Sequence, residues 1–298
     1  MERTEELEIQ KILRLNHPLG ISAKDVGSQI GISKHEINSY IYKNLKLFSR
    51  GKIKNSWIMC AETDSFMQKL QNREDAKCFS RENFDAIADW SYGKSHGNGN
   101  KNEYTTLCGN IIEYDSQYEK QLLEYLEENF LVKALGGQNL CIHYDREFMT
   151  NCSYYPDIAA LTWDDHIAII EVKPAAHMSN YKVLDKYDAL ENYCIKNGYM
   201  YVMVDPIQDY TTYEELQNAD VQIPELQEFF EENCYDIDTR NLVMFDTEDV
   251  NDWFEDYGYL YTDDIDYFYL QVHTLIIQYG WYNKAEYGGF QVYNHPVK

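Results

Sequence analysis

Two carboxylates and an amine fall at predicted strand positions in one short stretch of the chain. Asp157 precedes the apolar run 158–161. Glu171 and Lys173 follow a second apolar run, 167–170. Side chains alternate between the two faces of a β-strand, so Glu171 and Lys173, two residues apart, are expected on the same face. Carboxylates on strands apolar enough to be buried are costly unless they share a cation, so the stretch predicts a divalent metal site beside an ammonium group.

The elements around this stretch are predicted from local patterns. The two apolar runs, joined by the polar residues 163–166, predict a β-hairpin. Residues 139–144 predict an earlier strand, residues 181–197 a helix that ends at Gly198, and residues 199–204 a final strand. With a helix upstream, the predicted order is helix, three strands, helix and strand over about 100 residues.

The upstream helix, predicted over residues 114–130, carries an acid on its apolar face. At 100° per residue, Glu119 falls in the middle of the stripe formed by leucines at 122, 123 and 126 and a phenylalanine at 130. One interpretation is a third metal ligand. The alternative is that Ser116 and Glu119, three residues apart, form a capping box at the start of the helix.

The motif Pro156-Asp157, a gap, and Glu171-Val172-Lys173 resembles the active-site motif of the PD-(D/E)XK nuclease superfamily. The resemblance implies an α/β fold with an αβββαβ restriction-endonuclease-like core. It also implies a Mg²⁺ or Mn²⁺ ion held by Asp157, Glu171 and the Val172 carbonyl, with Lys173 positioning the attacking water.

The same resemblance gives Glu119 a role. In this superfamily, notably in the Tn7-type transposon endonuclease subunit, a glutamate on the helix before the core sheet adds to the metal site, and Glu119 matches it. The catalytic set implied by the resemblance is therefore Glu119, Asp157, Glu171 and Lys173.

The N-terminal residues predict a helix-turn-helix followed by a wing. Helices are expected over residues 5–15, 22–30 and 34–45, with Ser33 and Glu36 forming a capping box at the third. Isoleucines 37 and 41 and leucine 45 repeat at four-residue intervals, so they are expected to face the core. Residues 47–59 predict two strands around a basic turn, as in a winged helix.

The opposite face of the third helix and the wing carry polar and basic side chains suited to nucleic acid. The predicted nucleic-acid-binding residues are Lys34, His35, Asn38, Ser39, Tyr42, Lys46, Lys52, Lys54 and Trp57. Within the winged helices, this segment resembles the Zα domains, which bind left-handed duplexes, in Lys34, Asn38, Tyr42 and Trp57. It departs from them at Asn55-Ser56, where a Zα wing carries two prolines. The alternative is a winged helix used for protein contact or dimerisation.

Charge is distributed unevenly along the 298 residues. The net charge is −24, yet residues 1–58 contain ten Lys and Arg against six Asp and Glu. Residues 205–267 contain 20 acids and a single basic residue, Arg240. A duplex partner is therefore expected at the N-terminal end, while the acidic end repels polyanions.

Composition also limits the class of protein. No apolar run reaches 18 residues and the start has no signal-peptide pattern, so we expect a cytoplasmic protein without a membrane partner. The seven cysteines contain no C-x-x-C pair, which disfavours zinc ribbons and disulfide frameworks. Among the histidines, only His177, four residues beyond Lys173, is a candidate ligand.

Four regions are predicted. They are a winged helix-turn-helix domain at residues 1–60, a linker at 61–105, a nuclease-like core at 106–206, and an acidic, aromatic-rich region packed on the core at 207–298.

The predicted function is a Mg²⁺-dependent endonuclease that acts on double-stranded DNA and cuts either as a homodimer or with a partner protein. Two alternatives stay open. One is a non-catalytic DNA-binding regulator in which Glu171 and Lys173 are merely an ion pair at a strand end. The other is a sensor or antagonist of Z-form nucleic acid. DNA and RNA substrates are not distinguished by the sequence.

Overall fold

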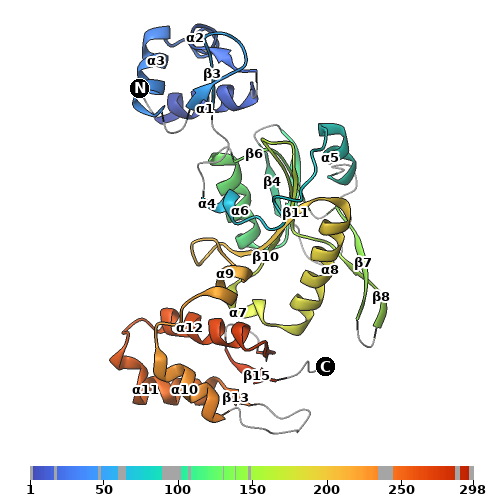
Figure 1. Cartoon of the computed structure of the whole chain (residues 1–298), viewed down its shortest axis with the longest axis vertical. Coiled ribbons are helices and arrows are strands. Elements are labelled where there is room, and N and C mark those ends of the chain that lie inside the picture. Colours follow the sequence, from blue (N-terminus) through green and yellow to red (C-terminus); the bar gives the residue numbers. More distant parts are fainter. Residues whose placement is uncertain are drawn as a thin grey trace. The chain divides into compact units, whose positions relative to one another are not determined.

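The chain is of the α/β class and combines helices with several sheets (Figure 1). The computed structural model describes residues 3–16, 19–45, 48–59, 65–88, 102–106, 109–129, 131–137, 139–146, 149–233, 244–285 and 289–294. The chain divides into two compact units. One comprises Met1–Leu140, Pro156–Ile169 and Ile195–Tyr201, and the other comprises Cys141–Tyr155, Ile170–Cys194 and Val202–Lys298.

The N-terminal residues form three helices and a small sheet. The helices are α1 (Arg3–Leu15), α2 (Ala23–Ile30) and α3 (Lys34–Lys43). The antiparallel sheet has the order β1-β3-β2, with β1 at Ile21–Ser22, β2 at Phe48–Arg50 and β3 at Ser56–Met59.

Local signals explain where these helices begin and end. The Ser33 hydroxyl accepts a hydrogen bond from the Glu36 N–H while the Glu36 carboxylate accepts one from the Ser33 N–H, which is the predicted capping box. Gly31 ends α2 with a φ of 75°, a conformation that glycine adopts without steric cost. Ile37 and Ile41 are buried as predicted. Leu45 is exposed because α3 ends at Lys43, so its prediction as a core residue was wrong.

The described part of the predicted linker, residues 65–88, forms secondary structure and makes backbone hydrogen bonds to distant segments. It contains α4 (Ser65–Gln68) and α5 (Arg81–Ile87). Gln71 bridges to Tyr201, and the Lys77 N–H donates to the Gly198 carbonyl. Backbone groups of Gln71 and Lys77 are therefore paired with residues more than 100 positions away in the chain. The Gly- and Asn-rich stretch 92–101 lies outside the described residues.

A five-stranded sheet has the order β12-β11-β10-β9-β6. Its strands are β6 (Val132–Gly136), β9 (Ile158–Thr162), β10 (Ile167–Val172), β11 (Met200–Asp205) and β12 (Thr211–Thr212). The strand β6 runs antiparallel to β9, with Leu135 opposite Ala160. Every residue of β9, β10 and β11 is buried, which explains why these strands are continuous apolar runs.

The first strand of this sheet is not the one that the sequence predicts. The prediction placed it at residues 139–144, but β6 pairs with β9 instead. Residues 142–144 of the predicted segment belong to β7 (Ile142–Arg146), which pairs with β8 (Met149–Tyr154) in a separate two-stranded ribbon. The burial of β7 alternates along the strand, so one face of the ribbon is solvated, unlike the buried strands of the main sheet.

Helices precede and separate the strands of this sheet along the chain. Among them are α6 (Gln117–Glu128), α7 (Ala175–Met178) and α8 (Tyr181–Asn197). Before α6, the strands β4 (Asn102–Thr105) and β5 (Ile111–Tyr114) form a hairpin. In chain order, α6, β6, β9, β10, α8 and β11 give helix, three strands, helix and strand, with the β7–β8 ribbon inserted after β6.

The C-terminal residues form an aromatic-rich helical layer with a small sheet. Its helices are α9 (Tyr213–Asn218), α10 (Pro224–Asn233), α11 (Thr247–Asp256) and α12 (Ile265–Gln278). Its sheet has the order β13-β15-β14, from Phe245–Asp246, Gln291–Tyr293 and Tyr282–Asn283. Phe230 stacks on Trp281 at 5.5 Å between ring centroids, within a core that also includes Phe268. In the described part of the chain, no helix has the length and apolar character needed to cross a bilayer.

Candidate functional site

The centre of the candidate site is Glu171, near the end of β10. Its exposed fraction is 2 %. The Lys173 ammonium lies 2.7 Å from Glu171 Oε1, and the Tyr154 hydroxyl donates a hydrogen bond to Glu171 Oε2. Charge-assisted hydrogen bonds of this kind offset the cost of burying a carboxylate. Both oxygens of Glu171 are therefore engaged by neighbouring side chains.

The Lys173 ammonium contacts a second oxygen of the same strand. Its Nζ atom donates to the Val172 carbonyl at 2.8 Å. A buried carboxylate oxygen and a backbone carbonyl oxygen thus converge on one positive charge. Hard oxygen donors of these two kinds are the ligands that Mg²⁺ and Ca²⁺ take in proteins. The chemistry of this donor pair fits a divalent cation, and in this structure the cation between the two oxygens is the ammonium of Lys173.

Tyr154 is a member of this cluster that the sequence analysis did not identify. It ends β8, and its side chain is buried. The Lys186 Nζ atom lies 5.7 Å from the centre of the Tyr154 ring, within the range of a cation–π contact. Tyr154 is one of two adjacent tyrosines before Pro156, and nothing in this local sequence signals a contact with Glu171, which is 17 positions away.

Asp157 lies directly before β9, the strand next to β10 in the sheet order. Its exposed fraction is 8 %, so this carboxylate is also buried. Within the described ranges, no group of three or more histidine, cysteine, aspartate or glutamate side chains is arranged to hold a metal ion.

Glu119 is buried at the start of α6, where it is bound to the helix terminus. Its carboxylate accepts a hydrogen bond from Ser116 Oγ at 2.8 Å and one from the Asp115 N–H at 3.1 Å. The Ser116 hydroxyl in turn accepts the Glu119 N–H at 3.1 Å. These contacts favour the capping interpretation of Glu119.

A second polar group lies beyond the end of β10. The buried Asp205 carboxylate accepts the N–H groups of Ala175 at 2.7 Å and Ile207 at 2.8 Å. Burial raises the pKa of Asp205, and its backbone hydrogen bonds oppose that rise. Burial lowers the pKa of His177, and the charge of Lys173 lowers it further. The imidazole of His177 is therefore biased toward its neutral form.

The N-terminal surface presents most of its predicted polar residues to solvent. Lys34, His35, Tyr42, Lys52 and Lys54 are exposed, and Asn38 and Ser39 are half-buried. Lys46 lies outside the described residues.

Trp57 differs from the prediction, because its side chain is buried. The Arg50 guanidinium lies 3.6 Å from the centre of its ring, and Tyr42 contacts it edge-on at 5.5 Å. Arg50, which the sequence analysis did not include, is therefore the exposed cation over Trp57.

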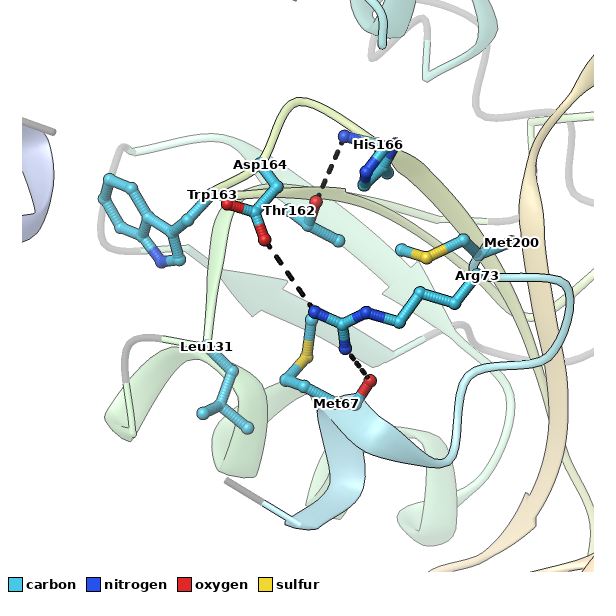
Figure 2. A pocket seen from close by; sticks show the side chains of 8 residues that line it. All are labelled: Met67, Arg73, Leu131, Thr162, Trp163, Asp164, His166 and Met200. Atoms are coloured by element: carbon cyan, nitrogen blue, oxygen red, sulfur yellow. Dashed lines mark hydrogen bonds and ion pairs between the residues drawn. The ribbon is translucent and has the colours of Figure 1, made fainter. Parts of the chain in front are cut away.

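A small cavity lies at the turn of the β9–β10 hairpin, at the other end of β10 from Glu171 (Figure 2). It is lined by Met67, Arg73, Leu131, Thr162, Trp163, Asp164, His166 and Met200. The Arg73 guanidinium donates to the Met67 carbonyl at 2.6 Å and lies 3.8 Å from the Asp164 carboxylate. The opposite charges of Arg73 and Asp164 face each other in this cavity. We therefore assign these residues the structural role of supporting the hairpin turn.

No protein-family model matches the chain, and no curated protein matches it.

Proposed function

We propose that this chain is a metal-dependent nuclease that hydrolyses phosphodiester bonds in double-stranded DNA. The observation that carries the proposal is the cluster of Glu171, Lys173 and the Val172 carbonyl at the end of a buried strand. Asp157, the predicted second acid of the set, is buried directly before β9, the neighbouring strand in the sheet order. A simple ion pair between Lys173 and Glu171 would not need the Val172 carbonyl as a second oxygen contact of the ammonium. Two oxygens around one cation are what a divalent metal site requires.

The proposed architecture is a restriction-endonuclease-like core with an N-terminal winged helix. The order α6, β6, β9, β10, α8 and β11 supports the core. The helices α2 and α3, followed by the antiparallel strands β2 and β3, support the winged helix.

The proposed chemistry assigns a role to each side chain. Asp157, Glu171 and the Val172 carbonyl would hold Mg²⁺ or Mn²⁺, which supplies Lewis-acid polarisation of the phosphate when it is bound. Lys173 orients the attacking water and offsets negative charge on the phosphate oxygens. Glu119 contributes by fixing the start of α6 through Ser116.

Duplex affinity is assigned to the N-terminal surface. Exposed Lys34, Lys52 and Lys54, together with Arg50 over Trp57, supply positive charge on that segment. Binding that rests on phosphate neutralisation weakens steeply with salt. This division of roles agrees with the local excess of basic residues in positions 1–58.

The test is cleavage of supercoiled and linear duplex DNA with Mg²⁺ or Mn²⁺. Asp157→Ala and Lys173→Ala are expected to abolish cleavage by the full chain. Lys196→Ala is the matched control, because this exposed lysine of α8 lies outside the cluster. Equal cleavage by wild type and both site variants would show that other residues carry the activity. Absence of cleavage on DNA, RNA and branched substrates would reject the proposal.

A DNA-binding regulator is the second candidate. The close Lys173–Glu171 ion pair is the observation that favours it, because that pair neutralises the buried acid without a metal. Calorimetric titration with Mn²⁺ separates the two functions. A nuclease binds the ion and loses binding in Asp157→Ala, whereas a regulator gives no heat that depends on Asp157.

A further inference from the structure

Tyr154, which donates a hydrogen bond to Glu171, is not part of the motif formed by Asp157, Glu171 and Lys173. Tyr154 comes from the β7–β8 ribbon, where it pairs with Ile142, while Glu171 comes from β10. The contact joins two elements that are separate in the sheet order. A buried phenol that reaches a buried carboxylate fixes where that carboxylate points.

The two oxygens of Glu171 have different neighbours. Tyr154 donates to Oε2, whereas Oε1 faces the Lys173 ammonium, which also contacts the Val172 carbonyl. A partial rotation of the carboxylate would move Oε1 away from the Lys173 ammonium and would break the hydrogen bond from Tyr154. The phenol therefore helps to hold the carboxylate in an orientation in which one oxygen faces the cation that also contacts the Val172 carbonyl.

We propose that Tyr154 is a positioning residue for the metal ligand Glu171, and that the Lys173 ammonium and a divalent cation compete for Glu171 Oε1 and the Val172 carbonyl. This inference rests on the proposed function, because it concerns the metal site of that nuclease. Tyr154 keeps its contact with Oε2 in both states, and Lys173 moves from Oε1 when the divalent cation binds.

The surroundings of Tyr154 suit this role. Its ring is buried and is contacted by Lys186, so the ring stays in place when only the hydroxyl is removed. Loss of a partner that orients a metal ligand typically weakens metal affinity by about 10–100-fold. The effect is expected in metal binding itself, before any substrate is present.

Isothermal titration of the full chain with Mn²⁺ tests Tyr154. We expect Tyr154→Phe to bind Mn²⁺ about 10–100-fold more weakly than wild type. The matched control is Tyr187→Phe, because Tyr187 is also buried and donates its hydroxyl to the Glu214 carboxylate at 2.5 Å. Unchanged Mn²⁺ affinity in Tyr154→Phe, or an equal loss in both variants, would overturn the role of Tyr154.

A second variant tests the competition with Lys173. Lys173→Met removes the ammonium and retains an unbranched side chain, so we expect tighter Mn²⁺ binding together with loss of DNA cleavage. Weaker Mn²⁺ binding in Lys173→Met would overturn the competition. Circular dichroism of each variant confirms that it is folded.

The titrations also distinguish failure of the proposed nuclease function from failure of the proposed role of Tyr154. Wild-type protein that binds no Mn²⁺ would reject the proposed nuclease and this inference together. Wild-type protein that binds Mn²⁺ and loses that binding in Asp157→Ala, while Tyr154→Phe binds normally, would reject the inference alone.

Discussion

The ammonium group of Lys173 lies 2.7 Å from Glu171 Oε1, beside a carboxylate that is almost wholly buried. Glu171 lies in β10, and Lys173 directly follows the last residue of that strand. Their spacing of two positions is the one expected for side chains on the same face of a strand. The pair neutralises a charge that would otherwise be costly inside the fold. It also places an amine directly at the proposed metal ligand, so stability and metal binding are linked at this position.

Loss of Lys173 is expected to destabilise the fold. Lys173→Met removes the ammonium group from the buried Glu171 carboxylate, so the free energy of unfolding should fall by about 1–3 kcal/mol. The loss should be smaller than for a fully buried ion pair, because a quarter of the Lys173 side chain is exposed to solvent. Urea unfolding measures the change. The double variant Lys173→Met/Glu171→Gln should recover part of the loss, and additive losses in the double variant would contradict a coupled pair.

Acid should destabilise the chain through His273. This histidine of α12 is buried against Phe290, with 4.6 Å between ring centroids, and its Nδ1 atom has no hydrogen-bond partner among the described residues. Burial lowers the pKa of His273 to about 3, and the charge of nearby His177 adds to this. The unfolded chain therefore binds a proton at this site more readily than the folded chain does. The resulting stability is fully present above about pH 6.5 and is lost as the pH falls toward 3, by about 1.4 kcal/mol per unit.

The measurement for His273 is the pH dependence of urea unfolding between pH 7.5 and 5. His273→Leu should give a shallower dependence than wild type, whatever its stability at pH 7.5. His35→Gln is the control, because His35 is exposed on α3. A wild-type dependence retained in His273→Leu would assign the acid sensitivity to other groups.

Glu119 is expected to act at the terminus of α6 and not at the metal. Ser116→Ala should reduce the free energy of unfolding by about 1 kcal/mol, a typical value for loss of an N-cap. Glu119→Ala should reduce it by a similar amount, and the double variant by less than the sum, because the two side chains share their hydrogen bonds. Glu128→Ala, at the exposed end of the same helix, is the control. A loss of Mn²⁺ affinity in Glu119→Ala that is absent in Ser116→Ala would restore the metal role.

The N-terminal surface should bind duplexes mainly through phosphates. Lys34→Ala is expected to weaken binding to different duplex sequences by similar factors, and to reduce the slope of log affinity against log salt by about one. Fluorescence anisotropy at several salt concentrations measures both. Lys24→Ala provides the comparison, since Lys24 is exposed on α2, outside the predicted surface. Equal salt slopes for wild type and Lys34→Ala would show that Lys34 does not contact a phosphate of the duplex.

Elements made by neighbouring residues were predictable. The helix predicted over residues 181–197 is α8, with the same bounds. The hairpin of β9 and β10 is where its apolar runs place it, and its turn contains Asp165 at a φ of 65°, which short polar residues tolerate. Capping, periodicity and alternation act within a few residues, so their signals are written locally in the sequence.

The sequence by itself determined the hairpin, its flanking helix, and the shared face of Glu171 and Lys173. Only the tertiary structure decided that β6, and not residues 139–144, completes the sheet, and that Tyr154 reaches Glu171. Strand β6 has five residues, one of them Lys133, and therefore gives only a weak local signal of a buried strand. Its place in the sheet comes from pairing with β9, about 25 positions away in the chain. Contacts between such distant segments depend on how the whole chain packs, and no spacing of residue types within one segment encodes them.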